Sequence, residues 1–336
     1  MISRKFSLFL IFLVLFIWLL IFFIVPSRSE ISINGETMGT TYEVKIQQEY
    51  PHNVDMISKG IDSILTVINQ SMSTYISNSE ISLINNTTTP NQLFSLSDDF
   101  KYVLEKSLEY YILTEGAFDV TIRPLLKLWG FKGETIYKKP DSFVIKDILK
   151  YIGSDNILFK FNKFSKKHPK LELDFGSIAK GYAVDKISEY LINFGYLIHY
   201  VEIGGEIICK GRDWNIQVAY PQFLSTKGFK ILKLNDKAVA TSGTYNQSMK
   251  VDGFEYSHIF DPRVGRPVKN NVVSVTVISD KCIDTDALST SLKVLGKEKG
   301  LELVNSIDNM ECMFILKEDG GLKDYYSNNF SAFILN

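Results

Sequence analysis

Two aspartates and three hydroxyl residues stand close together in the stretch IDTDALST, residues 283–290. Apolar residues recur at helical spacing in the following SLKVLGKEKGLELV, which predicts an amphipathic helix beginning near Asp284. Asp286 and Thr290 are four residues apart and would lie on one face of that helix. A carboxylate and a hydroxyl placed this way suit a hard cation such as Mg2+. The alternative is that Asp284 and Asp286 only cap the helix and complement its dipole.

A second candidate for chemistry is LDFGSIAKGYAVD, residues 173–185. Alternating apolar residues at 170–176 predict a strand, and helical spacing predicts a helix after it. Ser177 lies at the junction and is expected to cap this helix. Free amides at a helix N-terminus suit a phosphate. In the next predicted strand, the pair Gly204 and Gly205 indicates a bulge or a close approach of the backbone to another group.

The elements that must position these residues are mixed in type. Helical patterns at 54–70 and 98–115 bracket a polar loop at 77–89, and paired strands dominate after residue 200. A basic stretch at 160–170 is expected to be a solvated hairpin turn. Helices and strands alternate without a regular βαβ rhythm, so the predicted fold class is α+β.

Composition excludes several classes of protein. Of the 336 residues, 45% are hydrophobic and 22% are charged, which is typical of a globular chain. The formal net charge is −1 and no long basic run occurs, so nucleic-acid binding is not expected. Cys209, Cys282 and Cys312 are far apart and form no CxxC pair, which argues against a zinc site or a disulfide framework.

The N-terminal region predicts a membrane anchor. Residues 6–25 contain no charged residue and no glycine, and about 20 such residues span a bilayer. No A-x-A-like cleavage site follows, which favours an uncleaved signal anchor over a signal peptide. Arg4 and Lys5 precede the span and are expected to stay in the cytoplasm. The rest of the chain would then be extracytoplasmic, in a single-pass protein of the cell membrane.

A family resemblance rests on motifs that follow one another from about residue 36 to the C-terminus. They are MGTTY (38–42), STY (73–75), EGAFDVTIRPLLKLWGF (115–131), LDFGSIAKGYAVD (173–185), VEIGGEI (201–207), ATSGTY (240–245), SHIFDPRVGRP (257–267) and DTDALSTSLKVLG (284–296). Together they resemble the ApbE-type flavin transferases, which are FAD:protein FMN transferases. The resemblance implies one two-lobed domain at 36–336. The N-terminal sequence itself predicts the cytoplasmic segment at 1–5, the span at 6–25 and a linker at 26–35 before this domain.

The activity that the resemblance implies is Mg2+-dependent transfer of FMN from FAD to a threonine or serine of a partner protein, with release of AMP. Mn2+ remains an alternative metal. The implied acceptor carries a [DG]-x-x-[ST]-G-A-[ST]-like motif and is a subunit of a membrane redox complex. Two other functions stay open. One is a metal-dependent FAD pyrophosphatase that gives free FMN and AMP, and the other is a non-catalytic flavin-binding protein.

The resemblance also implies roles for individual residues. The metal would be held by Asp286, Thr290 and the backbone carbonyl of Ser177. Asp286 and His258 are the implied catalytic residues, with the His258 imidazole near the reacting phosphate, where it could take the proton of the acceptor hydroxyl. The implied FAD-contacting residues are Met38, Tyr75, Ala117, Phe118, Asp119, Asp174, Lys180, Ile259 and Phe260.

Two residues depart from the family pattern. Glu206 stands where aspartate is frequent, so a contact made there is expected to shift. Asp284 adds a carboxylate where a small residue is usual, and it would either cap the helix or lie behind a metal ligand.

Overall fold

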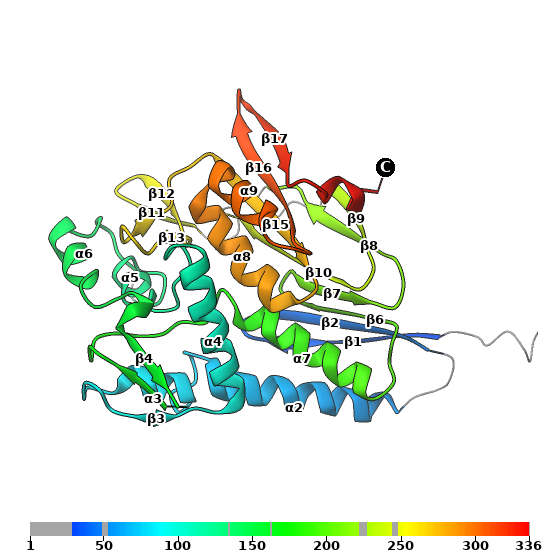
Figure 1. Ribbon diagram of the computed structural model, residues 1–336, viewed down its shortest axis with the longest axis horizontal. Helices are drawn as coiled ribbons and strands as arrows, with labels where there is room; N and C mark the ends of the chain where they lie inside the picture. Colours follow the sequence, from blue (N-terminus) through cyan, green and yellow to red (C-terminus); the bar gives the residue numbers. More distant parts are fainter. Residues whose placement is uncertain are drawn as a thin grey trace, which may run out of the picture.

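The structure is a computed structural model that describes residues 29–48, 53–133, 135–161, 163–221, 227–243 and 248–335 (Figure 1). The predicted cytoplasmic segment at 1–5 and the predicted span at 6–25 lie outside these residues. Within the described ranges, no helix is both long and apolar enough to cross a membrane. The first strand begins at Ser29, so the predicted linker at 26–35 is partly strand.

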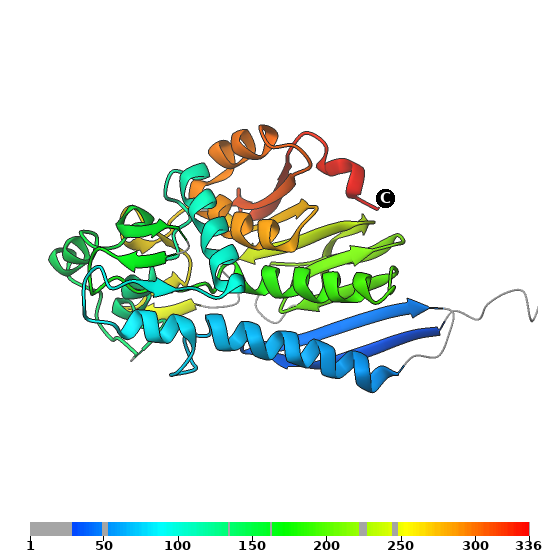
Figure 2. The same ribbon diagram turned by 60° about the horizontal axis from the view of Figure 1, so that its bottom comes forward.

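An antiparallel sheet of eight strands forms the centre of the fold (Figure 2). Each strand pairs with its neighbours in antiparallel register. In spatial order the strands are β1 (Ser29–Thr37), β2 (Thr40–Gln48), β6 (His199–Ile203), β7 (Glu206–Lys210), β10 (Lys237–Gly243), β15 (Val272–Ser279), β16 (Glu311–Glu318) and β17 (Gly321–Tyr326).

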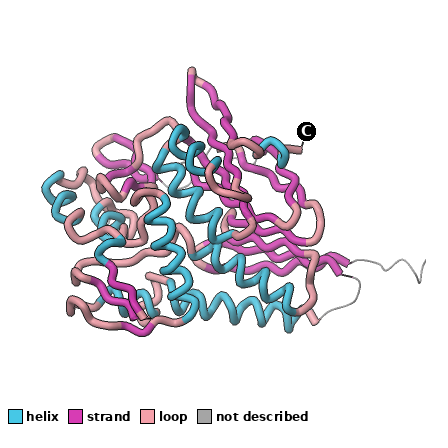
Figure 3. Tube along the Cα trace, viewed as in Figure 1, coloured by secondary structure: helices cyan, strands magenta, loops and turns pink. Residues whose placement is uncertain are grey.

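Helices cover one face of this sheet, and Figure 3 shows them in cyan across the magenta strands. α7 packs on β6 and β7, and α8 packs on β10 and β15. α2 lies beside α7 and contacts β1, whereas α9 contacts β16. The covering helices are α2 (Val54–Met72), α4 (Asp98–Leu113), α7 (Ala179–Asn193), α8 (Cys282–Leu295) and α9 (Lys297–Asn305).

The opposite face carries a second, smaller core. A hairpin of β8 (Trp214–Ala219) and β9 (Gly228–Leu234) covers it together with the C-terminal turn η2 (Phe330–Phe333). β16 shows how one strand serves both cores. Cys312 and Phe314 belong to the helix-side core, whereas Met313 and Ile315 belong to the hairpin-side core. Successive side chains of a strand point to opposite faces, so a strand buried on both faces is apolar throughout.

A second group of short elements lies at one end of the sheet, on the left of Figure 1. It includes a three-stranded sheet in the order β3-β5-β4 and two small hairpins. Its elements are α3 (Glu80–Asn86), β3 (Phe94–Ser95), α5 (Arg123–Leu128), α6 (Ser142–Ile148), η1 (Ser154–Asn156), β4 (Ile157–Lys160), β5 (Lys163–Lys166), β11 (Ser248–Val251), β12 (Phe254–Ser257), β13 (Phe260–Asp261) and β14 (Arg266–Pro267). The predicted α+β fold class is confirmed.

Several local predictions were wrong for identifiable reasons. The loop expected at 77–89 contains α3, which Ser79 caps by accepting a hydrogen bond from the Ser82 amide. The helix expected from 284 onward is two helices, because Gly296 has a φ of 81° and ends α8. Gly204 and Gly205, with φ of 60° and 102°, form the turn between β6 and β7 rather than a bulge. The alternative, a close approach of the backbone, is confirmed, because a Cβ at Gly204 would lie 2.7 Å from Thr40 Cγ2.

The strand expected at 170–176 does not form. The Asn85 side chain hydrogen-bonds to both backbone groups of Leu173. It accepts from the Leu173 amide at 2.7 Å and donates to the Leu173 carbonyl at 2.9 Å. The Asp174 amide donates to the Val120 carbonyl at 2.8 Å. Because these groups are already paired, the segment does not join a β-ladder beyond a single bridge between Ile122 and Glu172.

The hairpin expected at 160–170 is confirmed as β4 and β5. The prediction that this hairpin is solvated is only partly correct, because one of its lysines is buried. Lys166 is fully buried and donates to the carbonyls of Asn85 and Leu171, each at 3.0 Å. Burial lowers the pKa of Lys166 to about 8.

Candidate active site

α7 and α8 meet at Gly181, close to the start of both helices. A Cβ at this position would lie 2.3 Å from the Cys282 carbonyl oxygen and 2.8 Å from the Asp286 Cβ, so no side chain fits here. The close approach lets the Gly181 amide donate to Asp286 Oδ2 at 2.9 Å. Asp286 is buried, and this contact orients its carboxylate between the two helices.

This bond supplies a partner for the start of α7. The amide of residue 181 is one of the N-terminal amides that have no acceptor within the helix, and Asp286 accepts from it instead. Ser177 does not cap α7 as expected, because Ile178 is the N-cap and no side chain bonds there. Ser177, whose carbonyl the resemblance implies as a metal ligand, directly precedes this N-cap.

Thr290 lies one turn beyond Asp286 on α8, so the prediction that the two residues share a helix face is confirmed. The Ser242 hydroxyl, near the end of β10, lies 3.0 Å from Thr290 Oγ1 and 2.8 Å from Ser289 Oγ. The described residues contain no group of three or more His, Cys, Asp or Glu side chains that could hold a metal ion. A cation at Asp286 would therefore use hydroxyl and carbonyl oxygens, the donors that Mg2+ prefers.

Charged side chains surround Asp286. Lys180 forms an ion pair with Oε1 of Glu206, which follows the β6–β7 turn and is buried. Burial raises the pKa of Glu206. Burial also raises the pKa of Asp286, and the Lys180 ammonium opposes that rise. Burial would lower the pKa of Lys180, but Asp286 and Glu206 together hold it above its usual value.

The N-terminus of α8 is capped from another helix. Asp185 of α7 accepts hydrogen bonds from the amides of Cys282 and Ile283 at 2.8 and 2.9 Å. Burial raises the pKa of Asp185 to about 7. Asp284 is therefore not the cap of α8. Its Oδ1 instead accepts a hydrogen bond from the Tyr110 hydroxyl at 2.5 Å.

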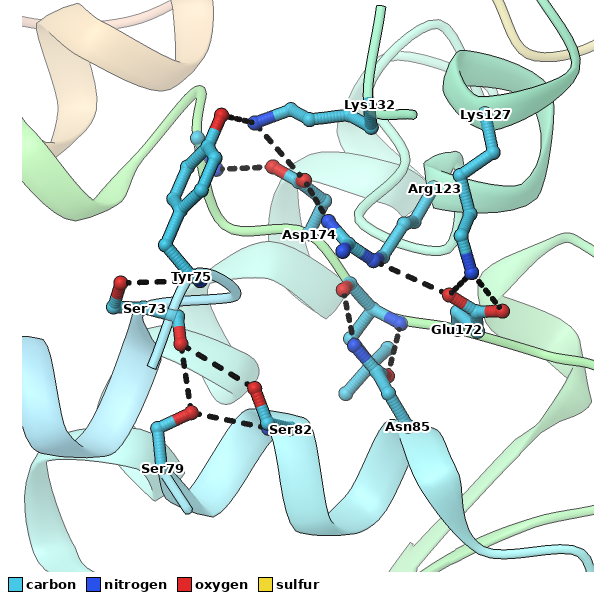
Figure 4. A network of polar contacts seen from close by, with 12 residues as sticks. Ser73, Tyr75, Ser79, Ser82, Asn85, Arg123, Lys127, Lys132, Glu172 and Asp174 are labelled. Carbon is cyan, nitrogen blue, oxygen red and sulfur yellow. Dashed lines mark hydrogen bonds and ion pairs between the residues drawn. The ribbon is translucent and has the colours of Figure 1, made fainter. Parts of the chain in front are cut away.

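Two predicted FAD contacts, Tyr75 and Asp174, meet in a polar network (Figure 4). Asp174 accepts from the Gly176 amide and from Arg123 Nη1, and its carboxylate is 3.4 Å from Lys132 Nζ. Lys132 also donates to the Tyr75 hydroxyl at 3.4 Å and lies 5.1 Å from the centre of its ring. Tyr75 is 83% exposed, so one ring face remains open to a planar ligand.

A sequence model of the ApbE family matches residues 38–314. The chain belongs to the ApbE family.

Curated relatives and solved structures agree with this membership. Proteins named FAD:protein FMN transferase are 38% identical in Vibrio cholerae serotype O1, covering 91% of this chain and 93% of the relative, and 34% identical in Haemophilus influenzae, covering 90% of each. The solved flavin transferase ApbE from Vibrio cholerae has a TM-score of 0.83 at 36% identity and covers 91% of this chain and 99% of that one. The apo form of the Pseudomonas stutzeri flavinyl transferase ApbE has a TM-score of 0.81 at 30% identity and covers 91% and 97%. The predicted ApbE-like fold is confirmed.

Three of the FAD contacts implied by the ApbE resemblance, Ala117, Phe118 and Asp119, are buried. Phe118 packs edge-on against Tyr110, with ring centroids 6.0 Å apart. Asp119 Oδ1 accepts hydrogen bonds from the Thr121 amide and hydroxyl and from the Ser154 hydroxyl. Burial raises the pKa of Asp119 to about 6. These buried side chains organise the loop that contains them.

The remaining residues implied by the ApbE resemblance differ in exposure. Met38 is half-buried in the β1–β2 turn and has a φ of 51°. Ile259 and Phe260 are buried, and Phe260 packs edge-on against Trp129 with ring centroids 5.8 Å apart. His258 is half-buried between β12 and β13. Ile259 and Phe260 therefore anchor the segment that carries His258.

Sequence reasoning missed the residues that hold the ApbE motifs in place. Asp185 and Gly181 lie inside the quoted LDFGSIAKGYAVD, and Ser242 lies inside ATSGTY, but their partners are distant in sequence. The only hint in the sequence was the high proportion of charged and hydroxyl residues within these short motifs. Arg123 and Lys132, which bond Asp174, gave no signal beyond the motif EGAFDVTIRP and its downstream loop.

Proposed function

We propose that this ApbE-family chain is a Mg2+-dependent FAD:protein FMN transferase that moves FMN from FAD to a threonine or serine hydroxyl and releases AMP. The names of the curated relatives support the activity. The observation that carries the proposal is the buried Asp286 carboxylate, which the Gly181 amide holds at the α7–α8 junction. The Thr290 hydroxyl, one turn later on α8, and the Ser177 carbonyl are the further oxygen donors that the family resemblance implies.

These donors fit a divalent cation. Asp286 Oδ2 is engaged by Gly181, which leaves Oδ1 for a ligand, and Thr290 presents its hydroxyl one turn away. When bound, Mg2+ neutralises negative charge that develops on the pyrophosphate during transfer. Because only a few protein groups would bind the ion, its remaining coordination positions would be open to phosphate oxygens and water. Lys180 is close enough to attract the Asp286 carboxylate but forms its ion pair with Glu206.

His258 would act on the acceptor. Its imidazole takes the proton of the acceptor hydroxyl as the oxygen forms a bond to the FMN phosphorus, and the pyrophosphate bond to AMP breaks. Tyr75 would offer its exposed ring to a planar part of FAD. Asp174 would contact FAD together with Arg123 and Lys132, the two positively charged side chains that pair with its carboxylate.

The acceptor and the location are also part of the proposal. We propose an acceptor protein with a [DG]-x-x-[ST]-G-A-[ST]-like motif in a membrane redox complex. The catalytic domain would face the extracytoplasmic side, attached by a single span at 6–25. The apolar, uncharged sequence of that segment supports this arrangement.

The test uses the full chain in detergent with FAD, Mg2+ and a peptide bearing the acceptor motif. Mass spectrometry should find FMN on the peptide and free AMP in equal amounts. Free FMN and AMP with an unmodified peptide would instead support an FAD pyrophosphatase. Bound FAD that is never cleaved would support a flavin-binding protein. Replacing Mg2+ by Mn2+ in the same assay compares the two metals.

Asp286→Ala tests the metal assignment in this assay. We expect transfer to be abolished, because the carboxylate is the only charged member of the proposed donor set. Asp284→Ala is the matched control on the same helix turn, and it should have a smaller effect because Asp284 bonds Tyr110 instead. Equal losses in the two variants would show that the carboxylates have been ranked wrongly, and full activity of Asp286→Ala would overturn the assignment.

A further inference from the structure

Three charged side chains come together where α7, α8 and the β6–β7 turn meet. Lys180 immediately precedes Gly181, whose amide bonds the Asp286 carboxylate. The Lys180 ammonium forms its ion pair with Glu206. Both carboxylates attract the ammonium, yet within the described part of the chain its ion-pair partner is Glu206 and not Asp286.

The cluster contains more carboxyl groups than ammonium groups. Two buried acidic side chains, Glu206 and Asp286, face the single ammonium of Lys180. Glu206 Oε2 is buried and has no hydrogen-bond partner among the described residues. A buried carboxylate oxygen without a partner is costly, so a further positive charge near this cluster would be stabilising.

The position of Lys180 decides which carboxylate can take that cation. An ammonium on a flexible side chain pairs with the nearest carboxylate, because Coulomb attraction falls with distance. If Glu206 were neutral, Asp286 would be the remaining partner. An ammonium paired with Asp286 would repel a divalent ion from the same oxygen atoms.

We infer that Glu206 is a positioning residue, which holds the Lys180 ammonium away from Asp286 and so keeps the Asp286 carboxylate free for a divalent cation. The inference rests on the proposed metal role of Asp286. It adds that Lys180 competes with the cation and that Glu206 suppresses this competition.

The experiment measures Mn2+ affinity of the full chain without FAD, from the EPR signal of free Mn2+. Glu206→Gln keeps the shape and removes the charge, and it should weaken Mn2+ binding by roughly ten- to a hundred-fold, as for other residues that act behind a metal ligand. Glu206→Asp keeps the charge and should bind more tightly than Glu206→Gln. Asp324→Asn is a matched control, because it breaks an ion pair of 3.0 Å with Lys230 elsewhere, and it should bind as the wild type does.

Lys180→Met separates positioning from a structural effect. Without the competing ammonium, Mn2+ affinity should be equal to or higher than that of the wild type. In the double variant with Glu206→Gln, binding should be at least as tight as in the wild type, since no ammonium is left to occupy Asp286. A double variant as weak as Glu206→Gln alone would overturn the inference, as would wild-type affinity in Glu206→Gln.

Asp286→Ala distinguishes this inference from the proposed function. If Asp286→Ala binds Mn2+ as tightly as the wild type does, the metal assignment itself fails. If Asp286→Ala abolishes binding while Glu206→Gln leaves it unchanged, only the inference fails. Should Glu206→Gln not fold, as judged by circular dichroism, Lys180→Met decides alone, and a fall in its Mn2+ affinity overturns the inference.

Discussion

At the scale of single residues, substitution of His258 should affect FMN transfer but not FAD binding. We expect His258→Asn to slow FMN transfer by roughly 10²–10⁴-fold, the usual contribution of a general base. FAD affinity should change little, because the neighbours Ile259 and Phe260 that anchor the segment remain buried. Peptide mass spectrometry follows transfer, and flavin fluorescence follows FAD binding.

His168 is the matched control for this substitution. It stacks on Tyr151 with ring centroids 4.8 Å apart, and its Nδ1 accepts a hydrogen bond from the Lys170 amide. His168→Asn should therefore leave the transfer rate unchanged. Transfer at the wild-type rate by His258→Asn would place His258 among the structural residues.

A second histidine makes stability depend on pH. His199 is fully buried, donates from Nδ1 to the Tyr196 carbonyl and accepts at Nε2 from the Ser188 hydroxyl, with both contacts at 2.7 Å. Burial lowers its pKa from 6.5 to about 4. Below pH 6.5 the unfolded chain takes up a proton that the folded chain refuses until about pH 4, so stability falls as the pH falls through this range.

The expected loss from His199 is about 3 kcal/mol between neutral pH and pH 4. Urea unfolding at several pH values measures it. His199→Gln does not titrate, so its stability should fall less over the same range. Parallel pH profiles of the two proteins would show that other groups cause the acid destabilisation.

At the scale of elements, the α7–α8 contact at Gly181 links packing to the site. Gly181→Ala would place a Cβ against the backbone of α8, so the helices must separate and the bond to Asp286 must lengthen. We expect a loss of about 1–3 kcal/mol in the free energy of unfolding, typical of overpacking, together with weaker Mn2+ binding. Urea unfolding and the EPR titration measure the two effects.

Gly133→Ala is the control for Gly181→Ala. A Cβ at Gly133 would meet no atom within 4 Å, so this change should affect neither stability nor metal binding. A Gly181→Ala variant with unchanged Mn2+ affinity would show that the amide of residue 181 does not set the position of Asp286.

The sequence predicted those elements whose pattern is local. Apolar spacing identified α2 and α4, and the four-residue spacing of Asp286 and Thr290 on α8 followed from helix geometry. Caps and backbone partners that come from distant residues were not predictable this way. Asp185 caps α8, and Asn85 keeps Leu173 out of a strand, because tertiary contacts override local preference.

For the candidate site too, some features could be predicted from the sequence and others depend on distant contacts. Family resemblance named Tyr75 and Asp174, which Lys132 links, and Asp286 and Thr290, which lie one turn apart on α8. It did not reveal that Phe118 and Asp119 are buried by the loop that they organise. Burial depends on the whole packed core, which a motif does not encode.

At the scale of the whole molecule, the N-terminal segment is expected to decide where the enzyme works. Residues 1–36 fused to a reporter that is active only outside the cytoplasm should export it and retain it in the membrane fraction, since a helix of this length inserts effectively irreversibly. A reporter recovered as a soluble, shortened protein would indicate a cleaved signal peptide. A fusion that lacks residues 6–25 is the control and should remain inactive inside the cell.

The order of strands in the sheet has a consequence for synthesis of the chain. β2 pairs with β6, with Ile46 opposite His199, although α2 to α7 lie between them in the sequence. The β1–β2 hairpin therefore leaves the ribosome long before its neighbour, and closing so large a loop makes this pairing slow. Until β6 arrives, β2 presents an unpaired backbone edge together with the apolar side chains of Val44 and Ile46. A nascent chain stalled between these two strands is thus the species most exposed to aggregation and proteolysis.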